Sequence, residues 1–546
     1  MRTMEQIISR NRYDIFLGFL VFVSAFGIKL YLGLPFQFPG HSDPSAYVIV
    51  ANNLYEGRGF VENYIGNWLN PDETLFHPSN EYWQPLASVV MFLFYKIFGQ
   101  SFRAAQMPSI LMGSILVVVA YGIALHIFNN RVKAIIASLL VLFAPSLMII
   151  SLQTASNIYA AVFQVLFLFG TYLVVREKPK NFYYYGMGLG VLAALAVLSR
   201  GDQQLLIPVL FICLLFSPHT LGEKVKFFAV FSGVYAVCMF PWYMRNYLAF
   251  GGTYSPAVNN VFWARTPHNL NFYFYHYDYS WQTLIDGGWN QIKVRLLQKP
   301  YMNIHWFVWA VTLSSLVFFF IGARKFANQK VYLPAFVLLL FYLLFYTLLA
   351  STSTPGNSAS GIIVFIMLIV TEGIYLVYNY LKARLPGNFH APILVVLTLV
   401  SMGSFFSFYF SGSLQARALG VNQSKIVLEE IHDWLKAREP KDPVIMTNLP
   451  WEMHLVTRYP TIHIPFDNGT MPGRLATVTL PYMPSPLYRK NVVLELIEKY
   501  KVNYIILVNQ LWWNVSPDTK ERLKKVLVKP NEPGNFGSGY TIYRVL

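Results

Sequence analysis

The stretch IFLGFLVFVSAFGIKLYLGL, residues 15–34, leads within a few residues into FPGHSDPSAYVIVANNLYEGRGF, residues 38–60. A helix of about 20 apolar residues crosses a hydrocarbon core of about 30 Å, so the first stretch is long enough to span a membrane. Its basic N-terminal flank resembles a signal sequence, but the run is too long for a cleaved segment, and no small-residue cleavage site follows it. We therefore predict a transmembrane helix with its N-terminus in the cytoplasm and Asp43 just beyond its far end.

The composition indicates a membrane protein with many spans. Hydrophobic residues make up 55% of the chain and charged residues 12%, and the mean hydropathy is +0.42, whereas a soluble domain has about 25% charged residues. We attribute the net charge of +16 to basic cytoplasmic loops, and we expect no nucleic-acid partner. Cys213 and Cys238 lie in apolar runs and belong to neither a metal-ligand pattern nor a disulfide framework.

Basic residues in the short loops orient the expected spans, because such loops are enriched on the cytoplasmic side. We place five of them there: NNRVK (129–133), REKPK (176–180), GEKVK (222–226), ARKFANQK (323–330) and LKARL (381–385). Eleven spanning helices then fit near 15–34, 106–127, 133–150, 155–175, 182–199, 203–216, 225–247, 304–322, 331–350, 358–380 and 391–411.

Two details qualify this topology. The apolar run at 85–99 is short and contains Lys96, and as a full span it would move every later basic loop outside; we predict an interfacial or half-inserted helix there. Lys29, within the first span, is expected to extend its side chain toward the outer surface. Residues 1–411 are therefore predicted to form a polytopic α-helical membrane domain, with outer loops at 35–105 and 248–303.

The chain changes character after residue 411. Apolar strand-like segments, PVIMT (443–447), VNYIILV (502–508) and YTIYRVL (540–546), alternate there with segments of helical period. This alternation predicts an outer α/β domain at 412–546 with a mostly parallel sheet. No glycine-rich phosphate loop follows any of the strands, so we assign the domain no nucleotide site.

Asp43 admits a purely structural interpretation. An aspartate followed by Pro44 is a favourable helix N-cap with proline at the first helical position. The helix would continue to about Tyr55, with Tyr47 and Leu54 on one face, as in an amphipathic helix that lies along a membrane surface. On this interpretation the carboxylate only caps the helix.

Four segments support a different interpretation. An acid follows the first span and precedes Tyr47 and Gly57, and three further segments come in order: HPSNEYWQPL (77–86), PWYMRNYLAFGG (241–252) and DPVIMTNLPWEMHLVTRYP (442–460). In this order the chain resembles the GT-C membrane glycosyltransferases. It is most similar to the branch of protein O-mannosyltransferases, aminoarabinose transferases of lipid A and RgtA-D-like bacterial polysaccharide-modifying transferases. Together the segments cover nearly the whole chain.

The resemblance implies an enzyme of cell-envelope glycosylation in the plasma (inner) membrane. Such an enzyme moves a hexosyl or pentosyl group from a polyprenyl-phosphate donor to a hydroxyl of a lipid, glycan or protein acceptor, with inversion and at the outer face among membrane lipids. This reaction needs a general base, for which Asp43 is the candidate, and cations for the departing phosphate. The phosphate-binding candidates are Arg200, Arg245 and Arg58. The substrate-binding candidates are His41, Tyr47, Tyr82, Gln84 and Asp202.

Alternatives remain open for these residues and for the function. Arg200 and Arg245 could anchor their helices at the interface, and Arg200 could pair with Asp202. Two alternative activities are a lipid-linked-sugar flippase or transporter, and a polysaccharide polymerase or ligase with a lipid-diphosphate donor. Against transport, the sequence shows no internal repeat, and Glu372 is the main charge inside the expected spans.

The chain also departs from the family pattern in ways that bear on metal binding. Pro44 stands where many members carry a second acid, and Asn157 stands where many carry an acid at the start of a later span. His77 and Glu81 are two candidate metal ligands, but two ligands at this spacing are weak support for a site. We therefore expect neither a metal ion nor another cofactor.

Overall fold

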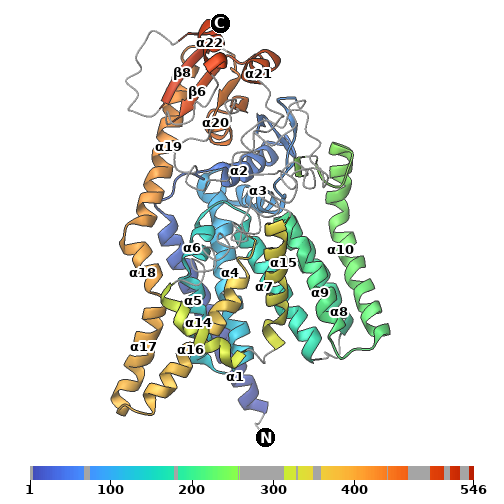
Figure 1. The fold of residues 1–546 in the computed structure, drawn as a ribbon, viewed down its shortest axis with the longest axis vertical. Helices are drawn as coiled ribbons and strands as arrows, with labels where there is room; N and C mark the ends of the chain where they lie inside the picture. Colours follow the sequence, from blue (N-terminus) through green and yellow to red (C-terminus); the bar gives the residue numbers. More distant parts are fainter. Residues whose placement is uncertain are drawn as a thin grey trace.

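The computed structural model of the protein describes residues 4–66, 74–177, 182–255, 257–258, 313–326, 330–348, 358–439, 441–464, 492–508, 517–528 and 540–546. A helical bundle forms one end of the molecule, and a β-sheet with its helices forms the other, here called the sheet end (Figure 1). The N-terminus lies at the opposite end from the sheet. Most of the outer loop expected at 248–303 lies outside the described residues.

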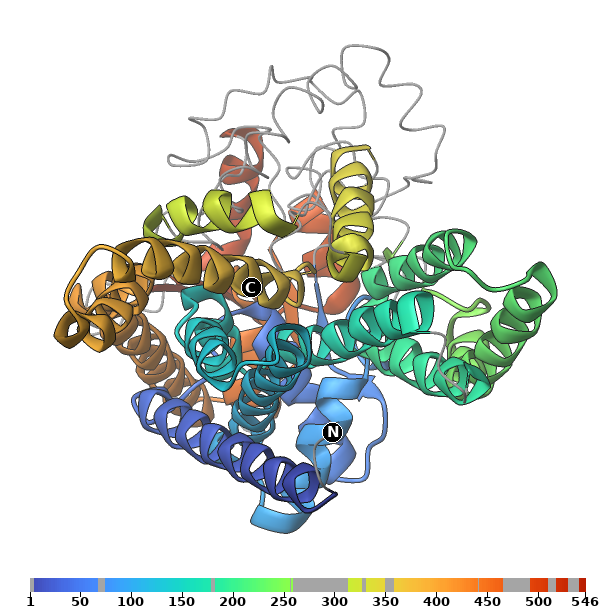
Figure 2. The ribbon, with the colours of Figure 1, turned by 90° about the horizontal axis from the view of Figure 1, so that it is seen from below.

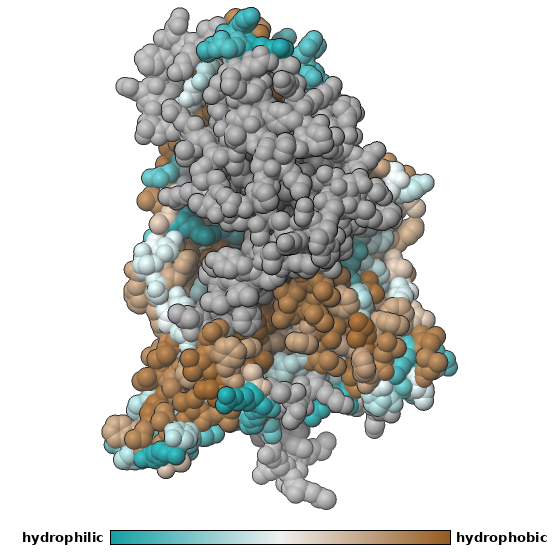
Figure 3. Space-filling view, viewed as in Figure 1, coloured by the Kyte–Doolittle hydropathy of each residue, from teal (hydrophilic) through white to brown (hydrophobic). Residues whose placement is uncertain are grey.

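Five long helices pack side by side across the bundle, each against the next, in the order α1, α4, α7, α8 and α10. Figure 2 shows α1 at one side of the bundle and the group containing α8 and α10 at another. Hydrophobic side chains gather over this helical part (Figure 3). The bounds of the five helices are Met4–Gly33, Phe102–Phe128, Asn157–Glu177, Phe182–Ser199 and Leu221–Phe250.

Helices later in the chain complete the bundle. Helix α16 (Ile362–Lys382) packs against α14 (Leu313–Phe326) and α5 (Arg131–Leu142), and α15 (Leu333–Leu348) packs against α7 and α9 (Leu206–Leu215). Within the described ranges six helices are long and apolar enough to cross a membrane, or eight if each of two bent pairs is one span. The eleven expected spans are therefore not all found among these residues.

The differences from the expected spans have local causes. The run expected as one helix at 133–150 is bent by 60° between α5 and α6 (Pro145–Leu152), because a proline cannot continue the hydrogen bonding of α5. A second bend, of 57°, separates α17 (His390–Ser401) from α18 (Gly403–Phe410) at a glycine. The runs at 203–216 and 331–350 form shorter apolar helices, and 304–312 lies outside the described residues.

Two basic helix ends, the start of α5 and the end of α14, meet at Glu372 of α16. Lys133, in the first turn of α5, donates to Glu372 of α16 at 2.5 Å. Lys325 of α14 forms an ion pair with the same carboxylate. Glu372 is thus a buried acid shared by two lysines from two predicted cytoplasmic loops, and it joins the start of α5 and the end of α14 to the middle of α16. The pairing explains how a charge is tolerated within an apolar helix.

Lys29 departs from the expectation. Its side chain is 1% exposed, and its Nζ donates to Ser151 of α6 at 3.0 Å. The amine therefore does not extend toward the outer surface but is buried between α1 and the bent α5–α6 pair. Gly113 of α4 leaves the space for this arrangement, because a Cβ there would fall on the Ser151 hydroxyl.

Helix α2 (Ser42–Tyr55) lies between the bundle and the sheet end and is buried on every side from Pro44 to Asn53. The expectation of an amphipathic helix on a membrane surface is therefore wrong. Helix α3 (Leu86–Phe98) packs against α2 on one side and against α4 on another, and it is too short to be a full span. It leaves Leu93 and Ile97 exposed.

The sheet at the other end has six strands in the order β2-β5-β4-β6-β8-β7. Strands β4 (Ile445–Thr447), β5 (Thr461–His463) and β6 (Tyr504–Val508) pair in parallel, and β8 (Tyr540–Val545) pairs antiparallel to β6 and to β7 (Leu527–Val528). The parallel edge strand β2 (Tyr64–Ile65) comes from the first outer loop. The sheet is completed by a segment that precedes residue 412. Its helices are α19 (Ser413–Lys436), α20 (Pro450–Thr457), α21 (Val492–Tyr500) and α22 (Pro517–Val526).

The crossing of α14 and α16 provides a test of the packing. A Cβ at Gly373 would fall inside the backbone carbonyl of Phe318, so the two helices touch backbone to backbone. We predict that Gly373→Ala forces them apart and costs about 1–3 kcal/mol, measured as a lower thermal unfolding midpoint in detergent. Gly188→Ala in α8 is the control, because a Cβ there meets nothing within 4 Å. Equal midpoints for the two variants would contradict the packing.

Candidate active site

Asp43 lies in the first turn of α2 and does not cap it. The helix begins at Ser42, its N-cap is His41, and no side chain makes a capping hydrogen bond. The half-buried carboxylate of Asp43 accepts a long hydrogen bond of 3.4 Å from the Ser42 hydroxyl. The capping interpretation of Asp43 is therefore wrong, and the carboxylate remains available for another role.

The first half of α2 is tied to the segment that joins α6 and α7. The Tyr47 hydroxyl lies 2.7 Å from the Ser156 hydroxyl, and the Thr154 hydroxyl donates to the carbonyl of Pro44 at 3.2 Å. Ser88 of α3 donates to the carbonyl of Tyr47 at 3.0 Å. Burial raises the pKa of Tyr47 above its ordinary value, so its hydroxyl stays protonated. These bonds fix the position of Asp43 relative to the bundle.

Arg200 follows α8 and is held by a polar cluster. Its guanidinium donates to Asp202 at 2.9 Å and to the Asn157 side chain at 2.7 Å. Asp202 also accepts from the hydroxyls of Tyr346 and Ser358, on α15 and just before α16. The pairing of Arg200 with Asp202 that the sequence left open is therefore present, and it orients the guanidinium. Asn157, where many proteins that the sequence resembles carry an acid, is one of the acceptors.

Arg200 and Asp43 both lie near Tyr47. The charges of both act on the Tyr47 hydroxyl. Two further candidates belong to the same region: Tyr82 also acts electrostatically on Tyr47, and the Gln84 amide lies against Gly201, next to Arg200. His41 precedes α2 and is influenced by the charges of Asp43 and of Arg417 on α19. The structure thus gathers most of the predicted site residues around Tyr47.

Two of the predicted arginines lie elsewhere. Arg245 of α10 donates to the carbonyls of Phe60 and Ser79, at 3.1 and 2.8 Å, and its guanidinium lies 5.0 Å from the ring of Trp242. Arg58, beyond the end of α2, forms an ion pair with Glu56. Their described contacts attach the first outer loop to α10 and to the end of α2, respectively. Neither set of contacts places a guanidinium beside Asp43.

The C-terminal region contributes one wall of the site. Helix α20 packs on α2, and Trp451 of α20 contacts Trp83, whose ring in turn contacts Tyr47. Glu452, beside Trp451, is 4% exposed, and its Oε2 receives no hydrogen bond from the described part of the chain. Burial raises the pKa of Glu452 to about 7, its own backbone N–H opposes the rise, and the negative charge of Asp43 adds to it.

Sequence reasoning missed Glu452, Tyr346 and Ser358. Glu452 lies in a segment that the resemblance covers, but nothing in the segment singles out that acid. Tyr346 and Ser358 reach Asp202 from positions far along the chain, and no local sequence pattern predicts such a contact. The one useful signal was Asp202 itself, an acid beside an arginine at a helix end.

The chain is similar to known proteins in sequence and in fold. Residues 77–244 match the family model described as dolichyl-phosphate-mannose-protein mannosyltransferase. The structure of ArnT from Cupriavidus metallidurans bound to undecaprenyl phosphate superposes with a TM-score of 0.58 at 13% identity, over 96% of this chain and 97% of that one. The chain has the fold of the GT-C membrane glycosyltransferases.

Two further solved structures share the GT-C fold. Archaeal oligosaccharyltransferase AglB from Archaeoglobus fulgidus, in complex with an inhibitory peptide and a dolichol-phosphate, has a TM-score of 0.56 at 15% identity, over 91% of this chain and 70% of that one. Arabinofuranosyltransferase AftD from Mycobacteria has a TM-score of 0.50 at 12% identity, over 96% of this chain and 40% of that one. A comparison with curated protein sequences found no match. The GT-C fold and the apolar helices identify an integral membrane protein.

Glu452 should make the folding stability of the protein depend on pH. Its pKa is raised from 4.5 to about 7, so the folded state holds a proton that the unfolded state releases. Stability should therefore fall as the pH rises from about 5 through about 7, by on the order of 3 kcal/mol. Glu452→Gln mimics the neutral acid. We predict that its thermal midpoint equals that of the wild type at pH 5 and exceeds it at pH 8. A midpoint difference that does not change with pH would contradict this.

Proposed function

We propose that this protein is an inverting glycosyltransferase that moves a hexosyl or pentosyl group from a polyprenyl-phosphate donor to an acceptor hydroxyl at the outer membrane face. The observation that carries the proposal is the half-buried carboxylate of Asp43, which does not cap α2 and lies at the junction of the bundle and the C-terminal region. Two proteins with the same fold have been solved with undecaprenyl phosphate or a dolichol-phosphate, which is the class of carrier proposed here. The acceptor is a lipid, a glycan or a protein.

Asp43 is the general base in this proposal. The acceptor hydroxyl must lose its proton as its oxygen bonds to the anomeric carbon, while the carrier phosphate leaves from the opposite face with the bonding electron pair. A base for this step needs a fixed position and a free acceptor atom. The bonds from Tyr47 and Pro44 to the 154–156 segment supply the first, and the absence of a capping bond within α2 supplies the second.

Arg200 is the cation best placed to meet the departing phosphate. It lies near Tyr47, as Asp43 does, and its planar fork suits phosphate oxygens. Asp202 occupies its Nε and Nη2 groups, but Nη1 carries two hydrogens and the described bond to Asn157 uses one. Asp202 then acts by orienting Arg200. Arg245 and Arg58 are less suitable, because their described contacts lie away from Asp43.

Charge supports placing the sheet end outside. The basic loops at 129–133 and 381–385 lie at the opposite end, with the N-terminus (Figure 1). Loops rich in Lys and Arg favour the cytoplasmic side. A lipid-phosphate donor keeps its tail in the bilayer and its sugar at the surface. The junction at α2, between the bundle and the sheet end, is therefore a suitable place for the reaction.

The test of the catalytic role is Asp43→Asn. Because Asp43 does not cap α2, the variant should fold, insert and bind donor as the wild type does. It cannot accept a proton, so turnover should fall about 10²–10⁴-fold. The assay measures polyprenyl phosphate released by purified protein from a panel of polyprenyl-phosphate sugars, together with donor affinity and thermal midpoint.

Glu56→Gln is the matched control, because it removes an acid from the other end of the same helix and should keep its turnover. Near-normal turnover of Asp43→Asn would rule out the base assignment. A wild-type protein that is folded yet releases no polyprenyl phosphate from any donor of the panel would count against the proposed reaction itself.

The membrane orientation is tested by labelling single cysteines in a background that lacks Cys213 and Cys238. Glu430→Cys lies on the exposed surface of α19 at the sheet end, and Ala383→Cys lies on the exposed basic loop at the opposite end. A membrane-impermeant maleimide added to intact cells should label Glu430→Cys, and should label Ala383→Cys only after permeabilisation. The reverse pattern would contradict an outer-face site.

A further inference from the structure

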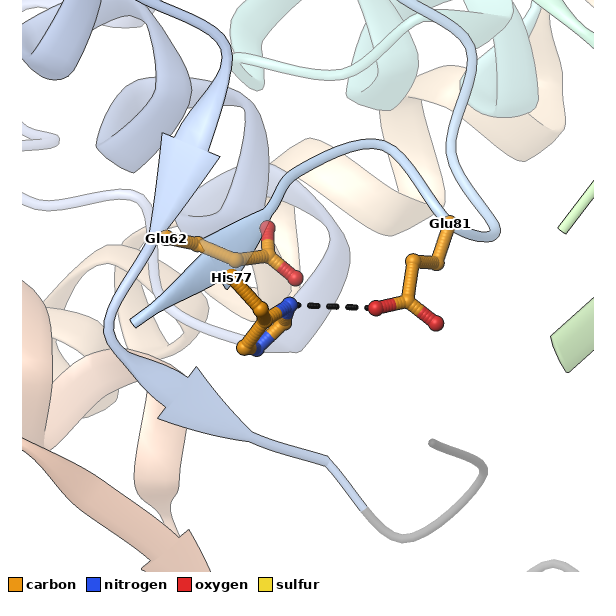
Figure 4. Close-up of side chains that lie close together, drawn as sticks. All are labelled: Glu62, His77 and Glu81. Atoms are coloured by element: carbon orange, nitrogen blue, oxygen red, sulfur yellow. Dashed lines mark ion pairs between the residues drawn. The ribbon is translucent and has the colours of Figure 1, made fainter. Parts of the chain in front are cut away.

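Three potential metal ligands meet in the first outer loop, apart from Asp43 and Arg200. Strand β1 (Val61–Glu62) pairs antiparallel with β3 (His77–Pro78), with Glu62 directly opposite His77. Paired residues point to the same face of a ribbon, and Glu81 reaches that face from the turn that follows β3 (Figure 4). One ligand atom from each residue lies within 4.8 Å of the other two. The strand pairing therefore adds Glu62 to the two ligands that the sequence offered.

Each of these three side chains uses one atom for a hydrogen bond outside the cluster and presents another atom to the other two ligands. The Nε2 of His77 lies 2.9 Å from the carbonyl oxygen of Tyr64, which can only accept, so Nε2 donates and Nδ1 faces Glu81 at 3.0 Å. The Tyr64 hydroxyl donates to Oε2 of Glu62 at 2.8 Å, and the Ser255 hydroxyl donates to Oε2 of Glu81 at 3.2 Å. A histidine fixed through its second nitrogen is typical of metal ligands.

The cluster requires a positive charge at its centre. Glu62, His77 and Glu81 are 3%, 2% and 5% exposed, and buried carboxylates are costly unless they are neutralised. Arg245 is near, but its described bonds go to backbone carbonyls and to the Asn246 side chain. The Oε1 of Glu81 is buried, and no hydrogen bond of good geometry reaches it from the described residues.

Two cations would satisfy this arrangement: a proton on Nδ1 of His77, which is also 3.1 Å from the carbonyl of Pro78, or a metal ion among the three ligands. A proton serves one carboxylate at a time, whereas a divalent ion binds both and also accepts the Nδ1 lone pair. An imidazole with two carboxylates suits zinc, whose bonds to nitrogen and oxygen are about 2.0–2.2 Å. Ligand atoms on a tetrahedral zinc are about 3.3 Å apart, so small side-chain rotations would close the observed separation.

We propose that Glu62, His77 and Glu81 bind one zinc ion, with a water molecule as the fourth ligand. The ion joins β1 to β3 and to the turn that carries Tyr82 and Gln84. It also lies next to the loop carbonyls that Arg245 holds. The bound ion thereby holds together the strands and the turn of the first outer loop that Arg245 and Ser255 contact. This site is independent of the transferase reaction and departs from our expectation that the chain binds no metal.

The test is the metal content of the full-length protein, purified without chelator and with its affinity tag removed. We expect about one zinc per chain by mass spectrometry, and at least a tenfold loss in Glu62→Gln and in His77→Gln. Glu452→Gln removes a buried carboxyl elsewhere and should retain the metal. Equal zinc in all variants would identify adventitious binding and overturn the proposal, as would a wild-type protein without zinc that gains none on incubation with zinc.

A second measurement does not require the variants to fold. Chelator treatment of the wild-type protein should lower its thermal midpoint by several degrees, zinc should restore it, and magnesium should not. Cobalt in place of zinc should give the intense visible absorption of a four-coordinate ion. A midpoint that responds neither to chelator nor to zinc would show that a proton on His77 neutralises the cluster, and would overturn the proposal.

Discussion

The burial of α2 is the constraint on which the remaining structure depends. Ten successive residues of this helix are buried, so both of its sides must be covered at once. The bundle covers one side through α3 and the 154–156 segment, and α20 covers the other. A helix enclosed in this way cannot tilt or slide without breaking contacts on both sides. The Asp43 carboxylate at its first turn therefore has a defined position relative to the bundle and to α20.

Much of this architecture could be predicted from the sequence, and what could not be predicted has physical reasons. Long apolar runs and short apolar strand segments indicate burial directly in the sequence, so the main spans and strands β4, β6 and β8 can be recognised there. The period of α2 was misleading, because a helix buried on two sides has no single apolar face. The bends before Pro145 and Gly403 break expected spans without shortening the apolar run. Tyr346, Ser358 and Glu452 join the site only through tertiary contacts.

Buried acids in the bundle and at its junction with the sheet end are held by partners from other elements. Asp202 is held by groups from three helical regions, and Glu372 by lysines from two loops. Glu452 is the exception among the described acids near Asp43, and its raised pKa is the result of that lack. In a region of low dielectric such pairings act as crosslinks between helices, because separating them would leave a buried charge alone.

The sheet that covers α2 has a consequence for how the chain is made. Its edge strand β2 is synthesised early, whereas β5, its parallel partner, follows only after every described helix of the bundle. Until then the backbone of Tyr64 and Ile65 lacks the strand with which it pairs, and the side of α2 that α20 covers stays exposed. The nascent protein must therefore insert its whole bundle with an unfinished upper surface. Helix α20 and strand β5 close that surface, so the surroundings of α2 are complete only after the whole described bundle has been made.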